Sequence, residues 1–206
     1  MKQIVPAERI GNVQEYYFSV KLKEIAQMNA QGADVINLGI GSPDLPPAKE
    51  VTDTLATEAE NPKAHGYQPY VGTPQLREAF AQWYKRWYNV ELNPVNEVLP
   101  LMGSKEGIMH ISMAFINEGD AVLVPNPGYP TYSSVSKLVG ARIISYNLSP
   151  EKGWQPDFEE LEAQHQAGEI NLEEVKLMWC NYPNMPTGAN GSMELFEKLV
   201  AFGKKY

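Results

Sequence analysis

The sequence is poor in the residues that disulfides, metal sites and membrane spans require. Its 206 residues include one cysteine, Cys180, so no disulfide can form within the chain, and we expect a reducing compartment. The three histidines are scattered, and their spacing suggests no metal site. No apolar run approaches the length of a membrane span, and the residues from Met1 to Pro6 lack the hydrophobic core of a signal peptide. These absences predict a cytoplasmic protein that does not enter a membrane.

An excess of positive charge is also missing. The formal net charge is −8, whereas a nonspecific nucleic-acid binder needs a basic face, so we expect no nucleic-acid partner. Neither a nucleophile elbow nor a Walker-type lysine motif occurs. The apolar content of 43% and the charged content of 20% are ordinary for a soluble globular protein, and 206 residues are enough for one sizeable domain or for a domain and an arm.

Hydrophobic periodicity predicts strands that alternate with helices, which is typical of an α/β sheet covered on both faces. Extended segments are predicted at 35–38, 98–101, 121–124, 142–146 and 175–180, and helices at 48–60, 105–117, 131–139, 156–166 and 193–204. In such sheets, ligands bind at the carboxyl ends of the strands. The loops after the strands are therefore where chemistry is expected.

Two further helices are predicted in the first hundred residues. One carries Phe18, Leu22 and Ile25 at helical spacing, and Ser19 is its expected cap. The other opens at Thr73-Pro74, with Thr73 as N-cap and Pro74 in the first turn, and its apolar stripe is expected to be buried. That stripe consists of Leu76, Phe80, Trp83 and Trp87. The helix 105–117 is nearly all apolar, so we expect it to be buried, with His110 as a hydrogen-bonded core residue.

The loop Gly103-Ser104-Lys105 lies between an extended segment and a helix. Gly103 permits close backbone approach, and Ser104 and Lys105 stand at the helix start, where free N–H groups and the helix dipole favour an anion such as a phosphate. The alternative is that Gly103 only turns the chain and Ser104 only caps the helix.

Three other loops contain candidate ligand contacts. Prolines around Tyr129 stiffen its loop, so its ring either stacks on a planar heterocycle or packs on the surface. Asn184, after the segment 175–180, either hydrogen-bonds a ligand or belongs to an ordinary loop rich in turn formers. Tyr67 precedes the helix at Thr73 and belongs either to the core or to a ligand site.

Taken together, the loops resemble those of class I and II aminotransferases of the pyridoxal-phosphate fold type I, from about residue 35 to the end of the chain. The matching pieces occur in the family's order and are Leu38 to Asp44, Tyr67-Gln68-Pro69 with Gly72 and Leu76-Arg77, Gly103 to Gly107, Pro125 to Tyr132, and Pro183 to Gly188. The resemblance implies a three-layer α/β/α large domain with a mixed, mainly parallel sheet, present here incompletely. It divides the chain into an N-terminal arm or small-domain segment, 1–45, and part of the cofactor domain, 46–206.

The resemblance also implies an activity and site residues. The activity is transfer of an amino group between an amino acid and a 2-oxo acid, with pyridoxal 5'-phosphate as cofactor, in a homodimer. The backbone at Gly103, Ser104 and Lys105 would hold the cofactor phosphate, and Tyr129 would stack on its ring. Tyr67 would reach the phosphate of the neighbouring subunit's cofactor. Gly41 would lie beside the substrate carboxylate.

Two departures from the family pattern stand out. An Asn that usually bonds the cofactor's phenolic oxygen is replaced by Met185, whose thioether is a weak acceptor and no donor, so the bond is lost unless Asn184 moves in. The family's catalytic lysine, which forms the Schiff base, and the residues that bind the ring nitrogen and the substrate carboxylate would lie beyond Tyr206. No catalytic residue is assigned within the chain, and we expect the chain to be inactive alone. A noncatalytic dimerising fragment and a lyase with the same cofactor are the alternatives.

Overall fold

The computed structural model describes residues 4–11 and 15–206, and these form two units. The first, which we call the strand unit, combines the described residues up to 11 with 102–206. The second, the helical unit, spans residues 15–101. Each is described by itself. Whether 1–45 and 46–206 are domains stays a prediction.

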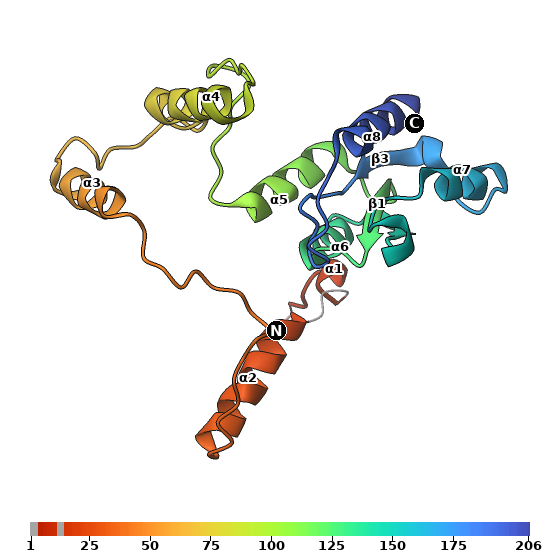
Figure 1. The fold of residues 1–206 in the computed structure, drawn as a ribbon, viewed down its shortest axis with the longest axis horizontal. Helices are drawn as coiled ribbons and strands as arrows, with labels where there is room; N and C mark the ends of the chain where they lie inside the picture. Colours follow the sequence, from red (N-terminus) through yellow and green to blue (C-terminus); the bar gives the residue numbers. More distant parts are fainter. Residues whose placement is uncertain (1–3, 12–14) are drawn as a thin grey trace. The chain divides into compact units, whose positions relative to one another are not determined.

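Helices and strands alternate along the strand unit, as the periodicity predicts (Figure 1). In chain order they are α1 (Glu8–Gly11), α5 (Ser104–Phe115), β1 (Ala121–Asn126), α6 (Pro130–Leu138), β2 (Arg142–Asn147), the 3-10 helix η1 (Pro150–Lys152), α7 (Phe158–Gln166), the 3-10 helix η2 (Leu172–Glu174), β3 (Val175–Met178) and α8 (Met193–Lys205). The α/β class is therefore confirmed.

The three strands form a parallel sheet in the order β2-β1-β3. The β1–β2 pairing is regular from Ala121 opposite Arg142 to Asn126 opposite Asn147. The β1–β3 pairing has an irregularity, because Ala121 lies opposite Val175 while the next residue, Val122, lies opposite Leu177. Both strand pairs are parallel, so all three carboxyl ends lie at one edge of the sheet.

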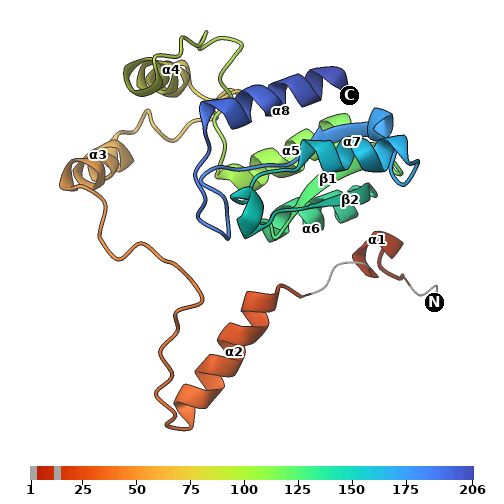
Figure 2. The ribbon, with the colours of Figure 1, turned by 45° about the vertical axis from the view of Figure 1, so that its right-hand side comes forward.

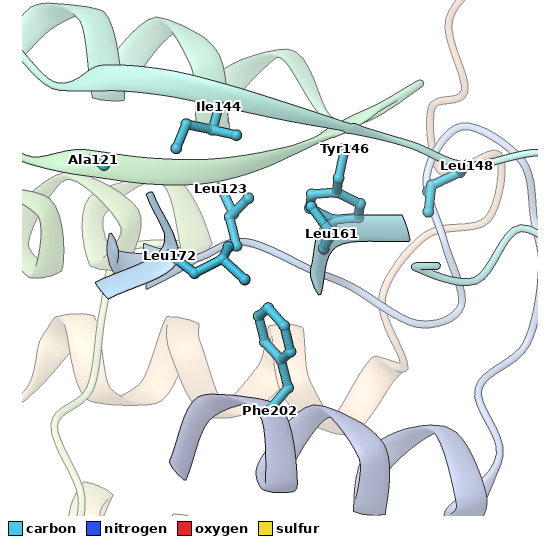
Figure 3. Packing of buried hydrophobic residues seen from close by; sticks show 8 residues of the cluster. All are labelled: Ala121, Leu123, Ile144, Tyr146, Leu148, Leu161, Leu172 and Phe202. Carbon is cyan, nitrogen blue, oxygen red and sulfur yellow. The ribbon is translucent and has the colours of Figure 1, made fainter. Parts of the chain in front are cut away.

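Side chains alternate between two cores on opposite faces of the sheet, as the pleat of a strand requires. The α7/α8 core contains Ala121, Leu123, Ile144, Tyr146, Leu148, Leu161, Leu172 and Phe202. The α5/α6 core contains Ile108, Ile116, Val122, Val124 and Tyr132. Figure 3 shows Phe202 pointing from α8 toward Leu172 and Leu123, and Figure 2 shows α8 and α6 on opposite sides of the strands. The result is the three-layer arrangement of helix, sheet and helix.

The helical unit contains α2 (Tyr17–Ala30), α3 (Lys49–Glu60) and α4 (Pro74–Tyr88). The start of α4 is as predicted, because the Thr73 side chain accepts a hydrogen bond from the backbone N–H of Leu76 at 3.3 Å and Pro74 occupies the first turn. Asn89 ends the helix in the left-handed conformation.

Several local predictions are wrong. The segments 35–38 and 98–101 contain no strand, because no neighbouring strand pairs with either of them. Helix α2 begins after Tyr16 rather than at Ser19, whose hydroxyl instead donates to the Glu15 carboxylate at 3.2 Å. His110 lies on the outer face of α5, where its side chain is 68% exposed beside Glu106.

The predicted burial of two helices is also wrong. The α4 stripe is exposed, and the buried residue of that helix is Ala81. Only one face of α5 is buried, through Gly107, Ile108 and Ser112. Apolar spacing identifies the face of a helix that prefers burial, but whether another element covers it depends on tertiary packing.

No helix among residues 4–11 and 15–206 is long and apolar enough to cross a membrane. The same residues contain no group of three His, Cys, Asp or Glu side chains placed to hold a metal ion.

Candidate functional site

The carboxyl-end edge of the sheet brings together two of the loops that the sequence singles out. The loop after β1 leads through Tyr129 into α6, and the loop after β3 contains Asn184. The ends of β1 and β2 are joined there, because the Asn126 amide donates to the Asn147 side-chain oxygen at 3.0 Å and the Asn126 carbonyl accepts from the Leu148 N–H at 2.8 Å. This is the edge at which parallel α/β sheets bind ligands.

Helix α5 begins without a side-chain cap, directly after Gly103. Gly103 has φ +94° and ψ +157°, a backbone conformation that only glycine adopts readily. A Cβ on Gly103 would have no neighbour within 4 Å, so the space beside it is open. The alternative in which Ser104 caps the helix is wrong, since Gly103 occupies the cap position. The first turn of α5 therefore has the features of an anion site: N–H groups that no capping side chain satisfies, and a glycine that lets a ligand approach.

One acidic side chain lies in that first turn. The Glu106 carboxylate accepts a hydrogen bond from the backbone N–H of Met102 at 2.5 Å. This hydrogen bond links the residue before Gly103 to the first turn of α5 and so fixes the position of the loop relative to the helix.

Tyr129 occupies the N-cap position of α6. The Lys105 Nζ atom lies 5.9 Å from the centroid of the Tyr129 ring. The tight loop before Tyr129 requires glycine, because a Cβ on Gly128 would lie 2.4 Å from the Pro125 carbonyl oxygen. The structure thus brings together Lys105 and Tyr129, which the sequence predicts for one site but separates by a helix and a strand.

Behind Tyr129 lie two aromatic residues that the sequence analysis did not single out. The Tyr129 and Tyr132 rings meet edge to face at 5.6 Å, and Tyr132 stacks on Trp179 at 5.1 Å with the ring planes 7° apart. Burial raises the pKa of the Tyr132 hydroxyl. The sequence gives no local signal for Trp179, because its stacking partner Tyr132 lies in α6, far from it along the chain.

Asn184 is 4% exposed, and its own loop uses its side-chain oxygen and its backbone N–H and carbonyl groups. Its side-chain oxygen accepts from the Thr187 hydroxyl at 2.7 Å, and its backbone N–H donates to the Ala189 carbonyl at 2.7 Å. Met185, the next residue, is 52% exposed. In the same loop, the Asn181 amide donates to the Pro183 carbonyl at 3.2 Å, while its side-chain oxygen is buried without a hydrogen-bond partner.

Tyr67 and Gly41, the remaining predicted site residues, belong to the helical unit. Tyr67 is fully exposed, and a Cβ on Gly41 would meet nothing within 4 Å. Their roles stay predictions.

These observations suit a phosphorylated planar cofactor. The uncapped start of α5 and the open space beside Gly103 fit a phosphate group, and the Tyr129 ring offers a surface for an aromatic ring. Together, the fold and this edge define an α/β protein in which the loops after the parallel strands β1 and β3, with the start of α5, form the candidate ligand site.

Comparison with known proteins identifies the class more narrowly. Residues 33–206 match the family model of aminotransferase class I and II, which covers most of the chain. The protein belongs to this family.

Particular relatives agree with that assignment. An LL-diaminopimelate aminotransferase of Dehalococcoides mccartyi is 41% identical over 200 residues, which are 97% of this chain and 50% of that protein. Transaminase BacF of Bacillus subtilis is 39% identical, and its ligand-free structure matches with a TM-score of 0.89 over 99% of this chain and 50% of BacF. An alanine aminotransferase structure from Pyrococcus furiosus matches at 26% identity with a TM-score of 0.86, over 98% of this chain and 50% of that one. The chain spans about half the length of these relatives.

Proposed function

We propose that this chain is the cofactor-phosphate half of a pyridoxal-phosphate-dependent aminotransferase, which moves an amino group between an amino acid and a 2-oxo acid. The observation that carries the proposal is the pairing of an uncapped helix start at Gly103 with an aromatic ring, Tyr129, in a member of the aminotransferase family. When bound, the cofactor supplies an electron sink, and the protein positions the cofactor and tunes its electronics.

Each predicted site residue has a distinct part in this proposal. The N–H groups at Ser104 and Lys105 bind the phosphate, while Gly103 keeps the approach open. Tyr129 holds the cofactor ring by stacking. In a homodimer, Tyr67 reaches the phosphate in the other subunit, and Gly41 lies beside the substrate carboxylate.

Asn184 contributes in a different way from the one the sequence predicts. The Asn184 side chain is buried, and its oxygen accepts a hydrogen bond from the Thr187 hydroxyl. We therefore propose that Asn184 shapes the loop and does not supply the cofactor contact that an Asn at position 185 would make. The phenolic oxygen of the cofactor then has no amide partner at position 185, because a thioether cannot donate a hydrogen bond.

The relatives suggest which substrate to test first. Because relatives from several organisms are named LL-diaminopimelate aminotransferases, we propose LL-diaminopimelate as the first amino donor to assay, with a 2-oxo acid as acceptor. We propose that the 206-residue chain by itself does not catalyse amino-group transfer, since it spans about half the length of those relatives.

The test is a chimera in which residues 1–206 replace the matching half of BacF in one polypeptide. We expect the chimera to bind pyridoxal phosphate and to transfer amino groups, while a Gly103→Val chimera loses cofactor affinity. The 206-residue chain alone, incubated with pyridoxal phosphate and reduced with borohydride, is expected to show scattered lysine labelling and no turnover. A folded chimera that binds no cofactor contradicts the proposal. If the chimera binds the cofactor but eliminates a substituent from the amino acid instead of transferring its amino group, the protein is a lyase.

A further inference from the structure

Arg77, in the first half of α4, hydrogen-bonds backbone carbonyls from two separate loops of the helical unit. Its Nε atom donates to the Gly72 carbonyl at 3.4 Å, and its Nη1 atom donates to the carbonyls of Pro94 at 2.5 Å and Val95 at 3.2 Å. Gly72 ends the loop before α4, whereas Pro94 and Val95 follow that helix. The bonds to Gly72 and Pro94 are partly buried, so water competes with them less than at an open surface. The guanidinium therefore joins two loops that α4 separates along the chain.

The loop after α4 is closed by hydrogen bonds of its own. The Val95 N–H donates to the Asn93 side-chain oxygen at 2.9 Å, and the Glu97 N–H donates to the Asn93 carbonyl at 2.9 Å. In return, the Glu97 carboxylate accepts from the Asn93 N–H at 2.7 Å. Because these bonds form a compact turn, the two carbonyls that Arg77 contacts in this loop are a fixed anchor for its guanidinium.

The loop before α4 carries Tyr67, whose side chain is fully exposed. The position of its ring therefore depends on the backbone of the loop. That loop ends in a turn in which the Gly72 N–H donates to the Pro69 carbonyl at 2.9 Å. Gly72 has φ +82°, and a Cβ on it would lie 3.0 Å from the Pro100 side chain. Glycine thus allows the turn to lie close against Pro100, and Arg77 holds its carbonyl.

We propose that Arg77 is a positioning residue of the candidate cofactor site, which fixes the loop 66–72 so that Tyr67 reaches the cofactor phosphate in the other subunit. This role rests on the proposed function, which assigns Tyr67 to that phosphate. It also explains why Gly72 and Arg77 accompany Tyr67 in one sequence motif. A lysine could not replace Arg77, because its ammonium is a single point charge, whereas the guanidinium fork donates from Nε and Nη1 to acceptors on two loops.

The first experiment measures the order of the loop without cofactor. Arg77→Lys is made in the BacF chimera, and hydrogen exchange of the backbone amides is followed by mass spectrometry in the absence of pyridoxal phosphate. Exchange in peptides that cover 66–72 is expected to speed up by about tenfold or more, because local opening no longer has to break the Arg77 bonds. Arg86→Lys is the matched control, since Arg86 is an exposed arginine of the same helix whose guanidinium lies over the Trp87 ring, and it should leave this exchange unchanged.

The second experiment asks whether Arg77 acts through Tyr67. Tyr67→Phe removes the hydroxyl that would bond the charged phosphate, so pyridoxal phosphate should bind about tenfold more weakly. Arg77→Lys should weaken the same binding by about fivefold, but it should add little in the Tyr67→Phe background, because two residues that act in series are not additive. Pyridoxal, which has no phosphate, should bind the parent chimera and every variant alike. Circular dichroism establishes that the variants keep the helix content of the parent.

Gly72→Ala tests the same loop by an independent route. The added Cβ would press on Pro100 at a φ that alanine rarely adopts, so the turn should move although Arg77 is intact. Faster exchange over 66–72 and weaker binding of pyridoxal phosphate are expected again, with pyridoxal unaffected. If Arg77→Lys does not fold, this variant decides the matter, and unchanged exchange and affinity in it overturn the proposal.

Three results with folded Arg77→Lys overturn the role: exchange over 66–72 stays the same, the losses in the double variant add up, or affinity for pyridoxal falls as much as affinity for pyridoxal phosphate. The last result would mark a general structural effect. If the parent chimera binds pyridoxal phosphate and Tyr67→Phe weakens that binding, while Arg77→Lys changes neither exchange nor affinity, the role is wrong and the proposed function stands. A parent chimera that binds no pyridoxal phosphate contradicts the proposed function, and the role of Arg77 fails with it.

Discussion

Tyr132 and Trp179 stack face to face, with ring centroids 5.1 Å apart and planes 7° from parallel. Tyr132 belongs to α6, and Trp179 follows β3 directly. The backbone N–H of Trp179 donates to the backbone carbonyl of Leu123 in β1 at 2.9 Å. The stack therefore joins the helix behind the Tyr129 loop to the carboxyl-end edge of the sheet, and it supports the position of Tyr129 from behind.

Removing the Tyr132 ring is expected to destabilise the strand unit. Tyr132→Ala leaves a cavity in the α5/α6 core and should lower the free energy of unfolding by about 3 kcal/mol or more, the usual cost of truncating a large buried aromatic side chain. Tyr132→Phe keeps the ring and should cost much less. Urea unfolding followed by circular dichroism measures both, and equal losses would mean that the hydroxyl rather than the stacked ring matters.

Gly103→Ala is expected to disturb the anion site. An alanine at φ +94° and ψ +157° is strained by about 1–3 kcal/mol, so the backbone before α5 should shift and its N–H groups should lose their alignment. Pyridoxal phosphate and inorganic phosphate should both bind more weakly. Gly153→Ala, at another positive-φ glycine that lies outside the site, is the control and should leave affinity unchanged. Unchanged affinity for Gly103→Ala would place the phosphate elsewhere.

Tyr129→Ala should weaken binding of pyridoxal phosphate more than binding of inorganic phosphate. The ring contact is worth about 1 kcal/mol beyond its buried area, and only the cofactor has a ring to stack. Tyr129→Phe preserves the face of the ring and should retain most of the affinity. Titration of both ligands against the three proteins separates stacking from a general loss of the site, which would lower both affinities alike.

Met185→Asn is expected to strengthen cofactor binding in the BacF chimera. The added amide can donate a hydrogen bond to the phenolic oxygen, which is worth about 1 kcal/mol. Because Met185 is 52% exposed, the stability of the chain should change by less than about 0.5 kcal/mol. Met193→Asn controls for the composition change. If affinity stays constant, the loop does not bring position 185 to the cofactor.

Asp157 should make the strand unit sensitive to acid. It caps α7 by accepting from the Glu160 N–H at 3.2 Å and pairs with the Lys152 ammonium at 2.9 Å. The hydrogen bond from Lys152, followed by that from Glu160, lowers the pKa of the Asp157 carboxyl. A folded-state pKa below the unfolded value stabilises the protein above the unfolded pKa of about 4, and this contribution disappears as pH falls through the folded pKa.

The measurement compares Asp157→Ala with the parent chain by urea unfolding across pH. Near neutral pH the variant should be less stable by about 1 kcal/mol, the usual value of an N-cap. The difference should shrink below about pH 4 as the carboxyl protonates. Asp157→Asn, which can still cap α7, should lose less, and a pH-independent difference would show that the charge makes no contribution.

The sequence by itself determined the elements whose causes are local. The Thr73-Pro74 pair fixes the start of α4, because an N-cap hydroxyl and a proline in the first turn act within a few residues. Apolar runs bounded by turn residues predict β1 and β2, and their order with the helices predicts the α/β class. The order of the loop motifs likewise predicts the family, which the match over residues 33–206 confirms.

Only the tertiary structure decided which surfaces are covered and which side chains meet. Burial of the α4 stripe and pairing of segment 35–38 both require partners distant in sequence, so spacing alone predicts them wrongly. The Tyr132–Trp179 stack joins residues that are brought together only when β3 pairs with β1. The central position of β1 in the sheet is likewise a property of strand order, because every strand has backbone groups to pair, and the order β2-β1-β3 determines which strands satisfy them.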